Sequence, residues 1–220
     1  MNDFIVIDLE MCRVPKSRRL SYHKGMETIQ IGAVRLDMEK GVTERFQTYV
    51  RPAHGHIGTD INVLTGISGY DVKRAPEIKE AISMFLNWVG NKNVTFVSWS
   101  MTDHDQILGE LRAKGIEMEG LEERLQQWED AQGLFSDKMD NPRQYSLDFA
   151  LKAADIETKG REHNALADTY NTALLFRKMK LEENLILNKY YQTAHEDTTP
   201  EPLHYSLCDM LKGLNLSAAG

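Results

Sequence analysis

The chain has 220 residues, 41% of them hydrophobic, and carries a formal net charge of −7 at pH 7. This length suits one domain, or one domain with an appendage, and the hydrophobic fraction is enough for a substantial core. The acidic balance argues against broad electrostatic binding to duplex DNA. It does not exclude an enzyme that binds a single nucleic-acid end through bound cations.

Cysteine usage and the N-terminal sequence exclude further classes. Cys12 and Cys208 lie far apart and neither belongs to a CxxC pair, so the sequence predicts neither a disulfide framework nor a zinc site. The N-terminus lacks a basic region followed by a long apolar stretch, and no apolar run approaches transmembrane length. We therefore expect a cytoplasmic protein that has no membrane partner.

The first quarter of the chain predicts three strands. An apolar run at 4–7 (FIVI) is typical of a buried strand, and the spans 28–37 and 43–52 have the composition of two more. Their close succession suggests an antiparallel meander. The following span, 53–75, is loop-like, with room for one short helix at 61–66.

From Pro76 onward the apolar residues follow a helical period. One helical face before the helix-ending Gly90 carries Ile78, Ile82, Phe85, Leu86 and Val89. Beyond this helix the sequence predicts a buried strand at 94–99, a helix through 107–115, either a helix or a last strand within 121–135, and helices within 145–155 and 164–180. This order predicts a mixed α/β fold with the two most apolar strands at its centre.

Two acids follow the first apolar run, one residue apart. On a strand, Asp8 and Glu10 would point to the same face, roughly 6.6–6.8 Å apart along it. Like charges beside an apolar core are costly unless a lysine, an arginine or a metal ion lies between them. A strand that ends in solvent is the simpler interpretation, but acids at the carboxyl end of a central strand often mark a site.

Two further motifs contain acids. The span 103–105 (DHD) follows the second buried strand, where its acids could instead cap a helix. His163 lies five residues before Asp168, a spacing that separates the two by about 140° on a regular helix. The pair forms a site only if His163 lies in a loop, Asn164 caps the helix and Asp168 projects from its first turns. Otherwise both are surface residues.

Together the three motifs have the chemistry of a metal-dependent phosphodiesterase. They supply one histidine, His163, and four carboxylates, those of Asp8, Glu10, Asp103 and Asp168. Hard oxygen ligands suit Mg²⁺ or Mn²⁺, and two such ions about 3.5–4 Å apart activate water and stabilise the leaving oxygen. Histidine titrates near neutrality and can take the proton from that water. We therefore expect two divalent metal ions as cofactors.

These motifs are similar to those of a known family. FIVIDLEMC (4–12), SWSMTDHDQILGELRAKGI (98–116) and REHNALADTYNTALLF (161–176) resemble the three motifs of the DEDD-type 3′–5′ exonucleases of the histidine subtype, in their Eri/KapD-like branch. With Trp99 aligned, the resemblance selects Asp103 over Asp105 as the second-motif acid, and Asp105 stays the alternative. The resemblance extends over residues 3–180.

The family has a ribonuclease H-like fold, which implies a mixed five-stranded sheet, an antiparallel meander followed by parallel strands, flanked by helices. The exonuclease domain would be 1–180, followed by a helical or irregular extension at 181–220. The resemblance also implies metal ligands and catalytic residues. The first metal would be bound by Asp8, Glu10 and Asp168, with Asp8 shared between both ions, and the second would be supported by Asp103. His163, the general base, and Glu10 would be the catalytic residues.

Some neighbouring residues would bind substrate. By the resemblance, Leu9, Met11 and Cys12 would line the terminal nucleotide, although plain packing explains all three as well. Trp99 could stack on a base, but its apolar neighbourhood favours the core. A basic cluster in the polar loop 13–25 either binds phosphates of an incoming strand or is a solvated surface: Lys16, Arg18, Arg19 and Lys24.

The implied function is an exonuclease that releases nucleoside 5′-monophosphates from the 3′ end of single-stranded RNA or DNA. Two alternatives are a non-catalytic regulatory or RNA-binding module on the same fold and a related ribonuclease H-like endonuclease. The complete set of acids and histidine disfavours the first alternative. The H-x4-D spacing disfavours the second, because such endonuclease sites need no histidine in this arrangement.

Overall fold

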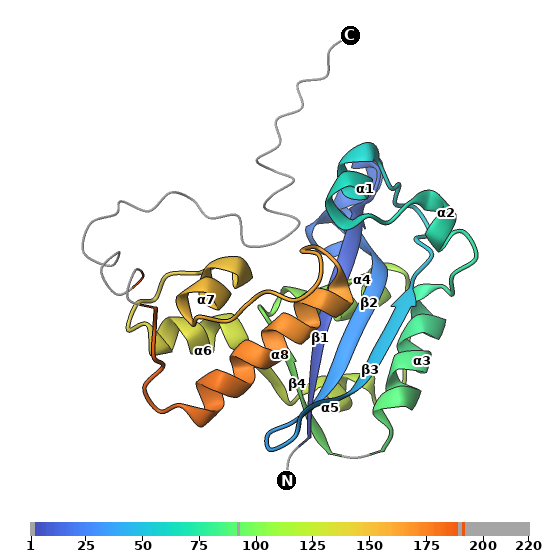
Figure 1. Cartoon of the computed structure of the whole chain (residues 1–220). Helices are drawn as coiled ribbons and strands as arrows, with labels where there is room; N and C mark the ends of the chain where they lie inside the picture. The colour runs from blue at the N-terminus through green and yellow to red at the C-terminus, as the bar shows by residue number, and fades with distance from the viewer. Residues whose placement is uncertain (1–2, 92, 189–190, 192–220) are drawn as a thin grey trace.

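A mixed sheet lies at the centre of the computed structural model, which describes residues 3–91, 93–188 and 191. The strands of this sheet are β1 (Asp3–Arg13), β2 (Met26–Asp37), β3 (Gly41–Tyr49), β4 (Val94–Ser98) and β5 (Trp128–Asp130), in the order β3-β2-β1-β4-β5 (Figure 1). The first three strands form an antiparallel meander, and β4 and β5 continue the sheet in parallel to β1. The predicted sheet is confirmed.

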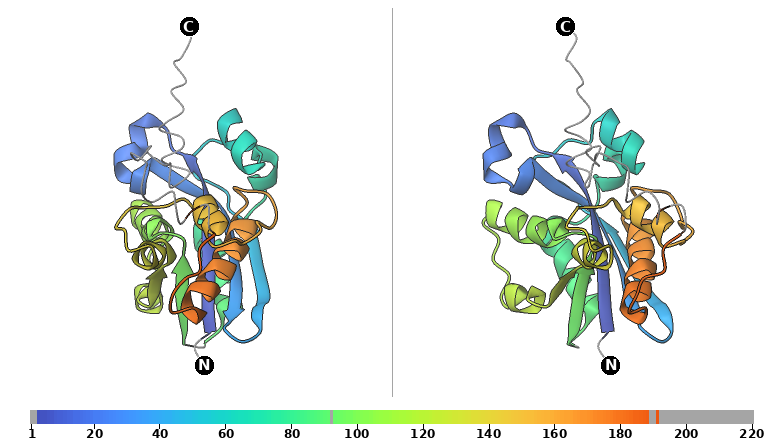
Figure 2. Two further views of the ribbon diagram at one scale, coloured as in Figure 1. Left: turned by 60° about the vertical axis from the view of Figure 1, so that its left-hand side comes forward. Right: turned by 90° about the vertical axis from the view of Figure 1, so that its left-hand side faces the viewer.

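Helices cover both faces of the sheet (Figures 1 and 2). One face packs against α3 (Ile78–Val89), α4 (Thr102–Ala113) and α5 (Leu121–Leu125), and the other against α6 (Ala131–Lys138), α7 (Leu147–Ala153) and α8 (Ala165–Leu181). Alternate residues of β1 supply the two cores, with Ile5 and Ile7 in the first and Val6 in the second. The predicted central position of this strand is therefore correct.

Short helices gather at the end of the sheet where β1 ends (Figure 2). They are the 3-10 helices η1 (Lys16–Ser21) and η2 (His23–Gly25) and the α-helices α1 (Thr59–Thr65) and α2 (Gly69–Val72). The polar span expected as a loop thus contains two helical turns. No described helix is both long and apolar enough to cross a membrane.

The first strand is longer than predicted. Asp8 and Glu10 do not follow its end but lie within it, because β1 stays paired with β2 as far as Arg13 through a register shift after Glu10. Its pairing with β4 covers only Asp3 to Val6. Beyond Val6, β1 therefore has no β4 residues paired beside it. Asp8 and Glu10 lie on this part of β1, where the two strands separate.

Two other expectations concern the second half of the chain. The ambiguous span 121–135 contains both of the predicted element types, because α5 is followed by β5 and then by the start of α6. The helix predicted at 164–180 is α8, which ends at Leu181. Most of the expected extension, 181–220, lies outside the described residues.

Candidate active site

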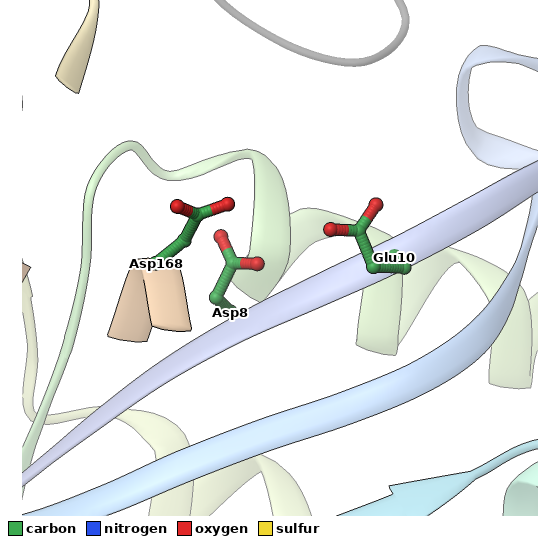
Figure 3. A group of neighbouring side chains, drawn as sticks. All are labelled: Asp8, Glu10 and Asp168. Atoms are coloured by element: carbon green, nitrogen blue, oxygen red, sulfur yellow. The ribbon is translucent and has the colours of Figure 1, made fainter. Parts of the chain in front are cut away.

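Three carboxylates converge above the middle of the sheet. Asp8 and Glu10 rise from the same face of β1, and Asp168 faces them from the first turn of α8 (Figure 3). One oxygen atom from each of the three lies within 4.8 Å of the other two. Glu10 is only 3% exposed. Asp168 thus joins two acids that precede it by 158 and 160 positions in the sequence to form one acidic cluster.

The start of α8 positions Asp168. Asn164 is the N-cap, and its side-chain oxygen accepts the Ala167 N–H at 3.2 Å. The Ala165 N–H donates to the Gln30 side chain of β2 at 3.2 Å. Gly32 permits this close approach, since a Cβ at that position would collide with the backbone of Ala165. The helix therefore begins directly against the sheet, with Asp168 over β1.

His163 lies in the loop before α8, as the spacing of the third motif requires. Its φ of +60° is left-handed, and its backbone N–H donates to Asp168 Oδ2 at 2.9 Å. The loop is also tied to its surroundings, because the Arg161 side chain donates to the Val63 carbonyl of α1 at 2.7 Å. The His163 side chain lines the same cleft as the three acids.

The second-motif acid that reaches the cleft is Asp103. It lies in the first turn of α4 and is 6% exposed, and its Oδ1 accepts the Leu9 N–H of β1 at 3.2 Å. Its carboxylate thus binds β1 in addition to its own backbone N–H in the first turn of α4. The Asp105 side chain is 52% exposed, pairs with His104 at 3.0 Å and does not line the cleft. The geometry favours Asp103, which the aligned register also selected.

The cleft between these elements has a volume of about 280 Å³. Leu9 and Met11 line it, and so does Trp99. Cys12 does not line it, because its side chain is fully buried close to Gly55 and Glu27. This placement favours plain packing over a nucleotide contact for Cys12.

Sequence reasoning missed part of the cleft wall. Ser146, Leu147 and Leu151 line it from the start of α7, and Glu162 lines it beside His163. No local pattern identifies the α7 residues, because only the packing of α7 next to α8 brings them to the acids. For Glu162, the one available signal was its position next to the candidate base.

The acids share one electrostatic environment. Burial, followed by the neighbouring carboxylates, raises the pKa values of Asp8 and Glu10 well above their ordinary values. Burial likewise raises the pKa of Asp103 and that of Asp168 to about 7, against the effect of the backbone N–H groups that bind them. Four ionised carboxylates in this cleft would repel one another strongly. A set of hard oxygen donors with this excess of negative charge fits divalent cations.

The metal-free site should make stability depend on pH. We expect the free energy of unfolding of wild type, relative to that of Asp168→Asn, to fall as pH rises from about 4 to 7. The Asp168 pKa is about 7 in the folded chain against an ordinary 3.8, so the folded chain binds this proton more tightly than the unfolded chain does. The resulting stabilisation of the folded state is complete below pH 3.8 and is lost as pH rises through 7. Denaturant titrations in EDTA measure this difference, and a difference that rises with pH would contradict it.

Comparisons with known proteins agree with the geometry. A family model described as exonuclease (RNase_T) matches residues 5–176. "ERI1 exoribonuclease 2" of Xenopus laevis is 30% identical over 181 residues, which are 71% of this chain and 26% of that protein. The chain thus spans about a quarter of the length of this curated relative.

Solved structures share the fold. The nuclease domain of 3′hExo, described as a DEDDh family member bound to rAMP, superposes with a TM-score of 0.70 at 20% identity, covering 86% of this chain and 96% of that one. S. pombe Pop2p in its Mg²⁺- and Mn²⁺-bound form gives a TM-score of 0.62 at 15% identity, covering 82% and 83%. Because the exonuclease family model matches most of the sequence, the chain belongs to this exonuclease family, and it shares the fold of the DEDDh nuclease domain of 3′hExo.

Proposed function

We propose that this chain is a two-metal-dependent 3′–5′ exonuclease that shortens single-stranded RNA or DNA and releases nucleoside 5′-monophosphates. The observation that carries the proposal is the convergence of Asp8, Glu10 and Asp168 within 4.8 Å, in a cleft that Asp103 and His163 also line. The exonuclease family and the exoribonuclease name of a relative support the reaction class.

The four acids are the proposed metal ligands. Asp8, Glu10 and Asp168 would hold one divalent ion, and Asp8 would be shared with a second ion that Asp103 supports. Mg²⁺ and Mn²⁺ suit these oxygen donors, and the related Pop2p fold was solved with both. When bound, two such ions supply an activated water and stabilise the leaving oxygen.

His163 is the proposed general base. Burial lowers its pKa, so the imidazole is neutral at pH 7 and can accept a proton from the attacking water. Its position in the loop, fixed by the backbone bond to Asp168, holds the ring at the cleft without making it a metal ligand. Glu10, the other proposed catalytic residue, acts through the metal it holds.

The size of the cleft favours a chain end as substrate. A volume of about 280 Å³ is close to the lower limit of small-molecule pockets, about 300–1,000 Å³. It suits one terminal nucleotide, which Leu9 and Met11 would contact, better than a continuous strand. A 3′-phosphate would bring additional negative charge next to Glu10 and should be excluded.

Linear and circular single strands of the same sequence test this proposal. With Mg²⁺ or Mn²⁺ we expect stepwise shortening of a 5′-labelled linear strand and mononucleotide products, and no reaction in EDTA. A 3′-phosphate should block the reaction, and the circle should survive. Duplex ends should react more slowly, because unpairing the terminal base costs a few kcal/mol. Efficient cutting of the circle would replace the exonuclease proposal with an endonuclease.

A further inference from the structure

An exposed basic segment lies beside the cleft and has no part in the chemistry proposed above. Its helix η1 carries Lys16, Arg18 and Arg19, all exposed to solvent. Within the described part of the chain, none of these three cations forms an ion pair with an acidic side chain.

The segment is held firmly to the body of the protein. The Val14 N–H donates to the Gly25 carbonyl at 3.0 Å and so closes the base of the segment. At η2, His23 packs directly on Gly109 of α4, where an added Cβ would come within 2.6 Å of the His23 side chain. The neighbouring Tyr22 is buried and its ring contacts that of His54. The exposed cations therefore project from a fixed base.

The same segment reaches the mouth of the cleft. Lys24 Nζ donates to Thr102 Oγ1 at 3.2 Å, and Thr102 lines the cleft next to Asp103. Lys24 has a left-handed φ of +48°, so the backbone accepts a less favoured conformation at this point. Figure 2 shows the segment beyond the end of β1, on the side of α4. Lys24 thus lies at the mouth of the cleft, and the cations of η1 lie in the same segment, outside the proposed site of the terminal nucleotide.

We propose that Lys16, Arg18, Arg19 and Lys24 bind backbone phosphates of the single strand upstream of its 3′-terminal nucleotide. The inference rests on the proposed function, because it takes the cleft as the site of that nucleotide. Arginine and lysine bind phosphates without reading sequence. Since the chain as a whole is acidic, attraction of a polyanion is confined to such a local patch.

A second feature favours a single strand over a duplex. Leu20, next to Arg19, projects completely into solvent, with a relative exposure of 104%. Single strands present unstacked bases as well as phosphates, and the surfaces that bind them combine cations with aromatic side chains on which bases stack. Leu20 is not aromatic, but its exposed apolar side chain gives an unstacked base a surface to pack against. A duplex keeps its bases stacked and would leave Leu20 without such a contact.

Direct binding measurements test the inference. In an Asp8→Asn background, which should not degrade the strand, Lys16→Gln/Arg18→Gln/Arg19→Gln should raise the Kd for a labelled strand of roughly ten nucleotides about tenfold or more at low salt. The slope of log Kd against log salt should fall by about 2, since each of three lost phosphate contacts contributes about 0.7. Fluorescence anisotropy measures both quantities.

A matched variant removes the same charge elsewhere. Lys40 in the turn between β2 and β3, Lys79 on α3 and Lys180 in the last turn of α8 are also exposed, and replacing all three by Gln should leave Kd and its salt slope unchanged. Equal losses of affinity in the two triple variants would overturn the inference, since net charge alone would then explain binding. Unchanged affinity in the η1 variant would overturn it as well.

Hydrolysis separates this inference from the function on which it rests. With Asp8 intact, the η1 variant should cleave a dinucleotide as fast as wild type, because that substrate reaches only the cleft. Its KM for the longer strand should rise while kcat stays constant. A slower reaction with the dinucleotide would overturn the inference, because the substitutions would then act on the cleft. A wild-type chain that cleaves neither substrate would contradict the proposed function, and the binding comparison would still decide the role of η1.

Discussion

Asp8→Asn is expected to abolish hydrolysis of single strands while raising the thermal unfolding temperature of the metal-free protein. In the proposed site Asp8 binds both ions, so no other acid can replace it. Without metal, its carboxylate is surrounded by those of Asp103, Asp168 and Glu10, which raise its pKa in addition to burial. Removing one of four crowded acids relieves this repulsion. Turnover with Mn²⁺ and calorimetry in EDTA measure the two effects.

The neighbouring acids of α4 supply the matched controls. Asp103→Asn should also lose activity, whereas Asp105→Asn should resemble wild type, because its exposed side chain pairs with His104 and does not line the cleft. An inactive Asp105→Asn protein beside an active Asp103→Asn protein would reverse the assignment of the second-motif acid. A strongly destabilised Asp8→Asn protein would instead indicate a structural role for Asp8.

His163→Asn is expected to lower kcat by roughly 10²–10⁴-fold, the range typical of a lost general base. Asparagine is chosen because it tolerates the left-handed φ of +60° at this position better than alanine does. Burial lowers the pKa of His163 below its ordinary 6.5, so the wild-type rate should fall only below that pH. This acidic limb should be missing from the pH profile of the variant.

Metal binding distinguishes a base from a ligand. Calorimetric titration with Mn²⁺ should give similar affinities for wild type and His163→Asn, because the imidazole is not among the proposed ligands. His56→Ala, which changes an exposed histidine outside the cleft, should retain full turnover. Loss of Mn²⁺ binding in His163→Asn would make His163 a ligand and refute its assignment as the base.

The parts of the fold that were predictable have local signals. The apolar run 4–7, the helical face of α3 ending at Gly90, and the spacing of His163 and Asp168 each lie within one segment of sequence. The helix-capping role of Asn164 also follows from its neighbours alone. Because the family's motifs are themselves such short segments, the class of site could be inferred without coordinates.

The remaining features depend on contacts between distant segments. The register shift after Glu10 is a property of the β1–β2 pair, so strand alternation could not show that Met11 reaches the cleft while Cys12 does not. Asp103 binds a backbone N–H that is 94 residues away. Glu27 is fully buried, and Lys114 bridges it to Glu110 at 2.8 and 2.7 Å. Only the Glu110–Lys114 pair, four residues apart, has a local signal; nothing in the sequence near Glu27 or Asp103 indicates their partners.

Anomalous diffraction from crystals grown with Mn²⁺ and a nucleoside 5′-monophosphate tests the two-metal site directly. We expect two manganese peaks about 3.5–4 Å apart, one in contact with Asp8, Glu10 and Asp168, and the other in contact with Asp8 on the side of Asp103. The nucleotide should lie against Leu9 and Met11. Manganese bound elsewhere on the surface, with none at Asp8, would contradict the two-metal site.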